Sequence, residues 1–269
     1  MVQRTDELTS SRWARPPALR ALSYFAYQYK RTWRGAVTVS FLYPVLYLAA
    51  MGVGLGSLVD HHVHQIDHVR YLVFIAPGLL ASTAMQIGGN ESMYPVMAAI
   101  KWVRTYFAML ATPLSVDDVL VGHLAWTAVR LFTVSTIYVG VMSAFSAALS
   151  PFVLIAIPAA MLTGLAFAAP ISAYSATQET DTAFATLYRM VMIPMFLFSG
   201  TFFPITQLPA WLRGIAYATP LYHGVSLCRD LTLGRVATGA DLEHALYLGA
   251  LFALGFLLAR RTYRRRLVV

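Results

Sequence analysis

Charged residues are scarce in this chain. They make up 12% of its 269 residues, whereas soluble domains carry about a quarter. Hydrophobic residues account for 58% of the sequence. Such a composition leaves too little polar surface for a water-soluble globule, and in lipid the backbone N–H and C=O groups of a single segment are all satisfied only within a helix. The sequence therefore predicts an all-α integral membrane protein.

Cysteine and lysine are almost missing. The single cysteine, Cys228, excludes a disulfide within the chain and any cluster of thiolate ligands around a metal. The only lysines, Lys30 and Lys101, follow Tyr and Ile, so the chain has no Gly-Lys-Ser or Gly-Lys-Thr loop to hold a nucleotide phosphate. We expect no catalytic residue, cofactor site or metal site in this chain. Any ATP, with its magnesium ion, would be bound and hydrolysed by another polypeptide.

The first 18 residues lack the apolar core of a cleaved signal peptide. They contain three arginines and a Pro-Pro pair instead. We expect a disordered cytoplasmic tail over residues 1–18, followed by a single transmembrane domain over residues 19–269.

Long uncharged runs divide the rest of the chain. The first, Val37 to Leu58, has 22 residues, which is enough to cross a hydrocarbon core of about 30 Å. Five further apolar runs follow it. We place the six spans at about residues 37–58, 71–91, 118–149, 152–175, 184–203 and 242–259.

Positive charge lies at the ends of these runs and orients them. The segments that six spans would leave in the cytoplasm hold 14 Lys or Arg residues, and the outer segments hold 4. Because basic residues collect on the cytoplasmic side, this asymmetry places both termini inside. The excess of arginine over lysine, 18 to 2, favours a bacterial source and hence a bacterial plasma membrane. Nucleic-acid binding is excluded, since it would need the basic residues on one solvated face.

An apolar stripe precedes the first span. Leu22, Phe25, Tyr29 and Trp33 recur at helical spacing within residues 19–34, and basic residues occupy the other positions. This pattern favours a helix that lies in the cytoplasmic interface among the membrane lipids. The alternative is a plain extension of the first span.

The segment between the second and third spans organises the rest of the chain. It contains acidic and basic residues and a proline, so it must leave the lipid. We predict a short amphipathic helix over about residues 100–111, with Trp102, Tyr106 and Met109 or Leu110 on one face.

Polar residues define the borders of this predicted helix. Lys101 and Arg104 flank its apolar face, and Pro113 would end it. Ser115 then precedes an acidic pair, which predicts an N-cap with two carboxylates near the positive end of the next helix dipole. A helix held tightly between two spans is a natural docking surface for a partner.

Residues 201–241 are too apolar for a solvated loop, yet prolines and glycines interrupt them repeatedly. We predict two short helices, at about residues 209–218 and 221–233, that dip into the outer leaflet and turn back. Such backbone is tolerated at membrane depth only where it packs against protein or lines a cavity.

The loop from His61 to His68 is rich in possible metal ligands. It is either a periplasmic metal or proton sensor or an ordinary connecting loop, and the lack of a second ligand cluster favours the ordinary loop. His62 and Asp67 also match the H-x4-D spacing of membrane acyltransferases, in which the acid orients a general-base imidazole. Four free positions make this a weak pattern.

Glu91 lies at the cytoplasmic border of the second span. A carboxylate there is able to couple proton movement to transport, as in a secondary transporter. The alternative, which we favour because the span is complete without Glu91, is an interfacial acid that pairs with Lys101, Arg104 or a partner chain. For Arg130 and Arg189, anchoring at a membrane border outweighs a role in substrate binding.

Four stretches carry a resemblance to a known family. They are APGLL at 76–80, LATPLS at 110–115, FSGTFFP at 198–204 and ATPLYH at 218–223. Together with the order of the expected helices, they make residues 19–266 resemble the permease subunit of type-2 ATP-binding-cassette (ABC) exporters. The resemblance is greatest to the branch that exports nodulation factors, or lipooligosaccharides.

This resemblance implies a dimer of permease subunits, identical or paralogous, bound to two cytosolic ATPase subunits that carry ATP and magnesium. A lipid-linked saccharide, a lipid or a hydrophobic drug would move outward between the two permease copies. Residues 101–114 match the helix that seats in a groove of the ATPase. The coupling residues implied are Glu91, Lys101, Trp102, Arg104, Tyr106, Phe107, Leu110, Pro113 and Leu114. Candidate residues of the transport path are Tyr43, Tyr47, Gln86, Phe196 and Phe198, for which contact with lipid or other helices is the alternative.

Overall fold

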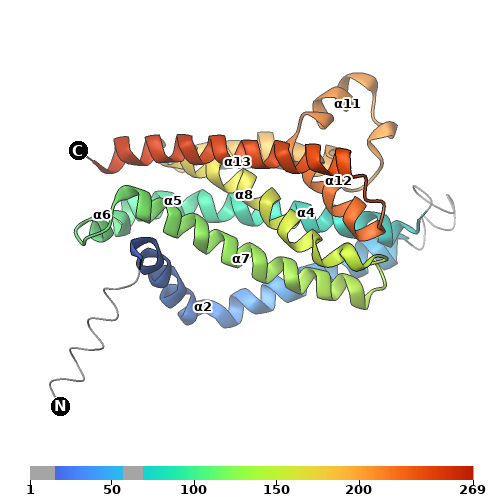
Figure 1. The fold of residues 1–269 in the computed structure, drawn as a ribbon, viewed down its shortest axis with the longest axis horizontal. Helices are drawn as coiled ribbons and strands as arrows, with labels where there is room; N and C mark the ends of the chain where they lie inside the picture. The colour runs from blue at the N-terminus through green and yellow to red at the C-terminus, as the bar shows by residue number, and fades with distance from the viewer. Residues whose placement is uncertain (1–15, 57–68, 269) are drawn as a thin grey trace, which may run out of the picture.

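The computed structural model describes the backbone of residues 16–56 and 69–268 (Figure 1). Its regular elements are helices, as the composition predicts. The expected tail over residues 1–18 and the histidine-rich loop, with His62 and Asp67, fall wholly or mostly outside the described residues.

Among the residues that the structure describes, four helices are long and apolar enough to cross a membrane. They run side by side along the long axis of the molecule (Figure 1). They correspond to the predicted second, third, fourth and sixth spans. Their bounds are Tyr71–Ser92 for α4, Val116–Ala144 for α7, Ala156–Ser175 for α8 after a short 3-10 helix at Pro151–Leu154, and Thr238–Leu267 for α13.

The predicted first span lies in helix α2, Pro17–Tyr47, which continues as the π-helical segment η1, Leu48–Leu55. Helix α2 also contains the predicted interfacial stripe, and it changes direction along its length (Figure 1). The first part of α2 therefore lies across the end of the bundle, and its second part runs along the bundle.

The predicted fifth span is shorter than expected. Three joined segments, α9 (Thr182–Leu187), η4 (Tyr188–Met192) and α10 (Ile193–Phe198), form it. At 1.5 Å per residue, Thr182–Phe198 reaches about 25 Å, less than a full hydrocarbon core. The helix ends before residue 203 because Gly200 adopts a positive φ of 81° and turns the chain. The total of six spans thus remains a prediction.

The two short helices predicted in residues 201–241 are present. Helix α11 covers Ala210–Tyr217 and helix α12 covers Pro220–Leu233. The Thr219 side chain caps α12, and Gly234, at φ 72°, ends it. Helix α12 packs against α4, α8 and α13, whereas α11 projects from the end of the bundle opposite the start of α2 and the end of α13 (Figure 1). The proposed location of these helices in the outer leaflet still depends on the predicted orientation.

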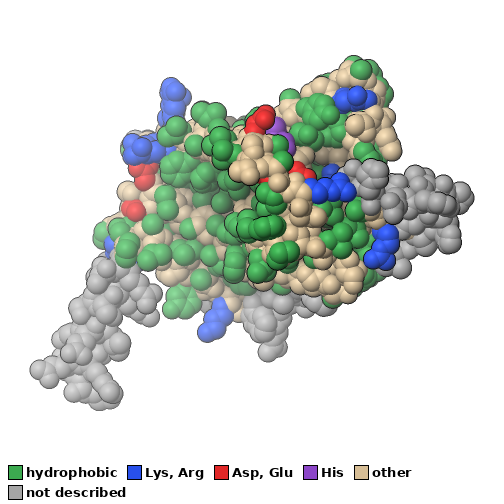
Figure 2. Space-filling view, turned by 45° about the vertical axis from the view of Figure 1, so that its right-hand side comes forward, with side chains coloured by type: hydrophobic (Ala, Val, Ile, Leu, Met, Phe, Trp, Pro, Cys, Tyr) green, Lys and Arg blue, Asp and Glu red, His purple; other side chains and the backbone are tan. Residues whose placement is uncertain are grey.

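Close packing in the centre of the bundle depends on glycine. Gly88 of α4 faces Gly164 of α8, and a Cβ added at Gly88 would overlap the Gly164 carbonyl group. The two helices therefore approach more closely than side chains would allow, as small residues permit in membranes. By contrast, hydrophobic side chains cover the middle of the outer face (Figure 2), as expected of a surface in contact with lipid.

Helix α13 differs from the predicted sixth span at its end. We expected the arginines after residue 259 to end it, but the helix continues through them to Leu267. Charge ends the lipid-embedded part of a helix without ending its backbone hydrogen bonds, and basic residues are favourable near a helix C-terminus. The extra turns place the arginines beside the segment between α4 and α7.

Candidate functional site

The coupling segment, which we define as residues 98–114, is not the single helix that the sequence predicts. A π-helical stretch, η2 (Ala98–Trp102), continues the short helix α5 (Tyr94–Met97), and a separate helix α6 covers Thr105–Leu110. Between them Arg104 adopts a positive φ of 56°, which is uncommon for a residue with a side chain. Helix α6 ends at Leu110, before Pro113 is reached.

This break divides the predicted apolar stripe. Tyr106 and Met109 are buried, at 0% and 7% exposure, but Trp102 is 57% exposed. Val103 and Phe107, at 70% and 36%, are exposed as well. The prediction that Trp102 shares a face with Tyr106 was wrong, because the left-handed residue between them rotates one half of the segment relative to the other.

The remaining predicted coupling residues lie around α6. Leu110 and Leu114 are partly buried and pack against the apolar cluster that contains Tyr106. Pro113 and Arg104 are exposed. One half of the coupling segment thus packs on the bundle while the other half faces outward.

The start of α7 is capped as predicted. The Ser115 hydroxyl oxygen accepts a hydrogen bond from the Asp118 backbone N–H at 3.2 Å, and Asp118 Oδ2 accepts one from the Ser115 N–H at 2.9 Å. Reciprocal caps of this kind stabilise a helix by about 1 kcal/mol. They fix the point at which the coupling segment joins α7.

Asp117, the other acid of this turn, binds α13. Arg260 and Arg264 approach Asp117 Oδ2 at 2.8 Å and 2.6 Å. Residues four apart share one face of a helix, so both arginines reach the same carboxylate. The sequence predicted only a dipole role for Asp117, because no local pattern reveals a partner 143 positions away.

A second ion-pair cluster involves Glu179, in the loop between α8 and α9. Its carboxylate lies 2.6 Å from Arg266 and 2.7 Å from Lys101. The hydrogen bond from Arg266, followed by that from Lys101, lowers the pKa of Glu179 to about 2. Lys101 therefore joins the coupling segment to α13 through Glu179, and does not pair with Glu91.

Aromatic contacts join the same elements from inside. Tyr106 and Tyr263 are both fully buried, and their ring centroids lie 5.7 Å apart. The Tyr263 hydroxyl is 2.7 Å from Ser172 Oγ on α8. Burial raises the pKa of Tyr106 well above its usual value, so the side chain stays neutral. These contacts link α6 to α13 directly, and to α8 through Tyr263.

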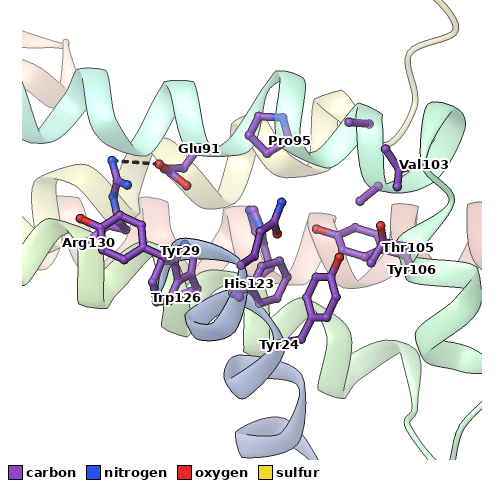
Figure 3. A pocket seen from close by; sticks show the side chains of 14 residues that line it. Tyr24, Tyr29, Glu91, Pro95, Val103, Thr105, Tyr106, His123, Trp126 and Arg130 are labelled. Carbon is purple, nitrogen blue, oxygen red and sulfur yellow. Dashed lines mark ion pairs between the residues drawn. The ribbon is translucent and has the colours of Figure 1, made fainter. Parts of the chain in front are cut away.

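A cavity of about 270 Å³ lies behind the coupling segment (Figure 3). The first part of α2, the α4–α6 region and α7 form its walls. At one end, Glu91 pairs with Arg130 at 3.4 Å, and Arg130 lies 5.1 Å above the ring of Tyr29. The lining side chains are those of Tyr24, Phe25, Gln28, Tyr29, Glu91, Pro95, Ala98, Ala99, Val103, Thr105, Tyr106, His123, Trp126 and Arg130.

This cavity corrects one expectation and adds residues that the sequence analysis missed. Glu91 binds Arg130 of α7, and neither of the predicted partners Lys101 and Arg104. His123 and Trp126 line the same cavity as Arg130. Positions 123, 126 and 130 share one face of a helix, and this spacing was the signal that could have found them.

The role of the candidate transport-path residues stays a prediction. The side chain of Tyr43 is outside the described part, and Tyr47 is half-buried at the edge of the main core. Gln86 is also half-buried, and Phe196 packs edge-on against Phe202, with 4.9 Å between ring centroids. Among the described residues, no group of three or more His, Cys, Asp or Glu is placed to hold a metal ion.

Known proteins with a similar sequence identify the family to which this chain belongs. Residues 21–233 match the family model described as ABC-2 type transporter. The chain is 33% identical over 241 residues to Nodulation protein J of Rhizobium leguminosarum bv. viciae, a match that covers 88% of this chain and 91% of the relative. It is 32% identical over 232 residues to Nodulation protein J of Rhizobium meliloti, with 84% of each chain covered.

A more distant relative points to the same class. The chain is 21% identical over 197 residues to the inner membrane transport permease YadH of Escherichia coli, across 71% of this chain and 74% of the relative.

Proposed function

Since the chain belongs to the ABC-2 type transporter family and is a multi-pass permease subunit of an ABC exporter, we propose that it moves an amphipathic substrate outward across a bacterial inner membrane. Permeases of this family work with ABC ATPase partners, and the matched region is a membrane domain. The relative in Escherichia coli is named an inner membrane permease, which supports the proposed location. The substrate would be a lipid-linked saccharide, a lipid or a hydrophobic drug.

The coupling segment is the proposed seat of the ATPase. The observation that supports this role is the exposure of Trp102, Val103 and Phe107 in a short connection between two spanning helices. Exposed apolar groups gathered at one place mark an interaction surface, and tryptophan is among the residues that contribute most to binding. The segment lies at the same end of the molecule as the start of α2 and the end of α13 (Figure 1).

The buried half of the segment would transmit the movement of the ATPase. Tyr106 contacts Tyr263 of α13, and Asp117, just after the segment, binds Arg260 of α13. Lys101 binds Glu179, which also binds Arg266 of α13. Two ATPase subunits, each with ATP and magnesium, and a second permease copy complete the proposed assembly. ATP-driven closure of the ATPase pair would push on the coupling segment and shift α7 and α13 together.

A double substitution, Trp102→Ala with Phe107→Ala, tests this seat. Both side chains are exposed, so we expect the variant to insert and fold while its affinity for the ATPase falls at least about tenfold. The measurements are co-purification of the ATPase and transport in reconstituted vesicles. Tyr106→Ala is a poor probe, because loss of a buried aromatic costs about 3 to 5 kcal/mol of stability.

The matched control is Trp211→Ala, at 71% exposure on α11 and at the other end of the molecule. It should retain full association with the ATPase. Normal transport by the double variant would refute the assigned seat, and transport by the isolated chain without any ATPase would refute the proposed mechanism.

A further inference from the structure

Building on the proposed export function, we propose that the cavity behind the coupling segment receives an uncharged sugar ring at the head of an amphipath from the inner leaflet. The alkyl chain of this ligand would stay in the lipid beside α2. Because the coupling segment forms one wall, occupation of the cavity would be communicated to the ATPase.

The walls of the cavity are largely aromatic. Tyr24, Phe25 and Tyr29 come from α2, Tyr106 from α6 and Trp126 from α7. Figure 3 shows Tyr29 and Trp126 toward one end, Tyr24 and Tyr106 toward the other, and His123 between them. Ligand sites combine apolar and aromatic walls with a few polar groups. A sugar ring matches this arrangement, because its C–H faces stack on aromatic rings while its hydroxyl groups point outward from its edge.

The charges in the cavity favour an uncharged ligand. Glu91 and Arg130 form an ion pair in which each side chain is 22% exposed. A ligand with a net charge would have to compete with this pair, and leaving either partner buried without its counter-ion is strongly unfavourable. A hydroxyl group is able to accept from the guanidinium or donate to the carboxylate without separating the two charged groups.

His123 supplies an unused hydrogen-bonding atom at the centre. The side chain is 2% exposed, and its Nε2 has no hydrogen-bond partner among the described residues. Buried polar atoms are normally paired, so an unpaired one at a cavity indicates a missing partner. A hydroxyl group both donates and accepts, and therefore satisfies Nε2 in either tautomer of the imidazole.

The size of the cavity limits what enters it. At about 270 Å³ it is slightly smaller than the lower limit of about 300 Å³ for drug-sized ligands. One ring fits into this space, but a whole amphipath does not.

The cavity is also connected to the coupling segment. Tyr106 presents its ring to the cavity and lies 5.7 Å from Tyr263 of α13, and His123 packs against Tyr106 at 6.4 Å between ring centroids. A ligand that holds Tyr106 in place would favour one conformation of the coupling segment, on which the ATPase would act. Linkage then requires that the ATPase in turn changes the affinity for the ligand.

A series of dodecyl amphipaths tests the proposal, because the chain is constant and only the head changes. The permease with its ATPase is placed in lipid nanodiscs, and Trp126 fluorescence is followed with dodecyl glucoside, dodecyl phosphocholine, dodecyl trimethylammonium and dodecyl sulfate below their micelle concentrations. Trp126→Phe defines the background. We expect saturable binding of the glucoside, at least about tenfold tighter than that of the three charged heads, and a rise in ATP hydrolysis at the same concentrations.

Three variants and a control show whether the cavity is responsible. His123→Ala and Tyr24→Ala should each weaken glucoside binding at least about fivefold, and His123→Gln, which keeps a polar group, should retain most of it. Tyr24 is 41% exposed, so its variant keeps the test valid if His123→Ala fails to fold. Val129→Ala, on an exposed part of α7, should bind as the unchanged protein does.

Two results would overturn the proposal. One is equal binding of all four heads, which would indicate only partitioning into lipid. The other is glucoside binding that is unchanged in both His123→Ala and Tyr24→Ala. Either result, in a complex that still assembles and hydrolyses ATP, leaves the export function intact, whereas failure to assemble with any ATPase would refute that function instead.

Discussion

Two histidines join α12 to the start of α13. The Nδ1 atoms of His223 and His244 lie 2.8 Å apart, and the ring of Tyr247 stacks on His223 at 3.9 Å between centroids. A short contact between two ring nitrogens is a hydrogen bond only if one of them lacks its proton. Burial, and then the neighbouring His244, lower the pKa of His223, whereas Glu243 and the Tyr217 backbone oppose the shift.

The contact between these histidines predicts a dependence on pH. Well above pH 6.5 the His223 ring is neutral in both the folded and the unfolded chain, so its contribution to stability is at its maximum. Below that pH the unfolded chain binds a proton that folded His223 resists, so stability falls as pH falls. We expect the thermal midpoint of the purified protein to decrease between pH 7 and pH 5, and to decrease less in His244→Phe. Equal slopes in the two proteins would contradict this explanation.

Individual side chains in and next to the coupling segment also show which features the sequence does and does not predict. Ser115 was predictable as a cap, because its partner is three residues away. The positive φ of Arg104 has no sequence signal, since glycine or asparagine is the residue usually found there. The exposure of Trp102 follows from Arg104 and was missed for the same reason.

The close approach of crossing helices depends on a few glycine residues. The clearest case is the contact between α4 and α8, where Gly88 meets the backbone of Gly164. Lipid offers helices little hydrophobic drive to associate, so close backbone contact has to supply much of the attraction.

A single methyl group should be enough to disturb this crossing. We expect Gly88→Ala to lower the free energy of unfolding by about 1 to 3 kcal/mol, because the backbone of α8 must move to make room. Thermal unfolding in detergent measures the change. Gly140→Ala is the control, since a Cβ at that position on α7 meets no atom within 4 Å. An unchanged midpoint for Gly88→Ala would mean that the two helices are less tightly packed than described.

The helices were predictable where proline, glycine or the end of a long uncharged run marks their borders. Proline and glycine bound α11 and α12, and long uncharged runs give α4, α7 and α8. The continuation of α13 past residue 259 was not predictable from hydrophobicity, because a helix and a membrane span end for different physical reasons. The contacts of α13 with Asp117 and Glu179 join residues far apart in the sequence, and only the fold brings them together.

The whole molecule has two distinct ends. One end holds the coupling segment, the start of α2 and the end of α13, and the other end holds α11 (Figure 1). The excess of basic residues near the termini predicts that the first end faces the cytoplasm.

Labelling of introduced cysteines tests this orientation. Thr180→Cys, in the loop between α8 and α9, should react with a membrane-impermeant thiol reagent only after the inner membrane is opened. Gly214→Cys on α11, where a Cβ meets no atom within 4 Å, should react in spheroplasts with an intact inner membrane. The native Cys228 is fully buried and provides the unmodified background. The opposite pattern of reactivity would reverse the proposed topology.

The last turn of α13 has a practical consequence for anyone who purifies this protein. Leu267 and Val268 border an open groove together with Leu110 and Leu114 of the coupling segment. An affinity tag that follows closely after Val268 would lie near the proposed seat of the ATPase. A preparation tagged there would recruit the ATPase weakly for a reason unrelated to the native protein. An epitope inserted at Gly214 avoids this artefact.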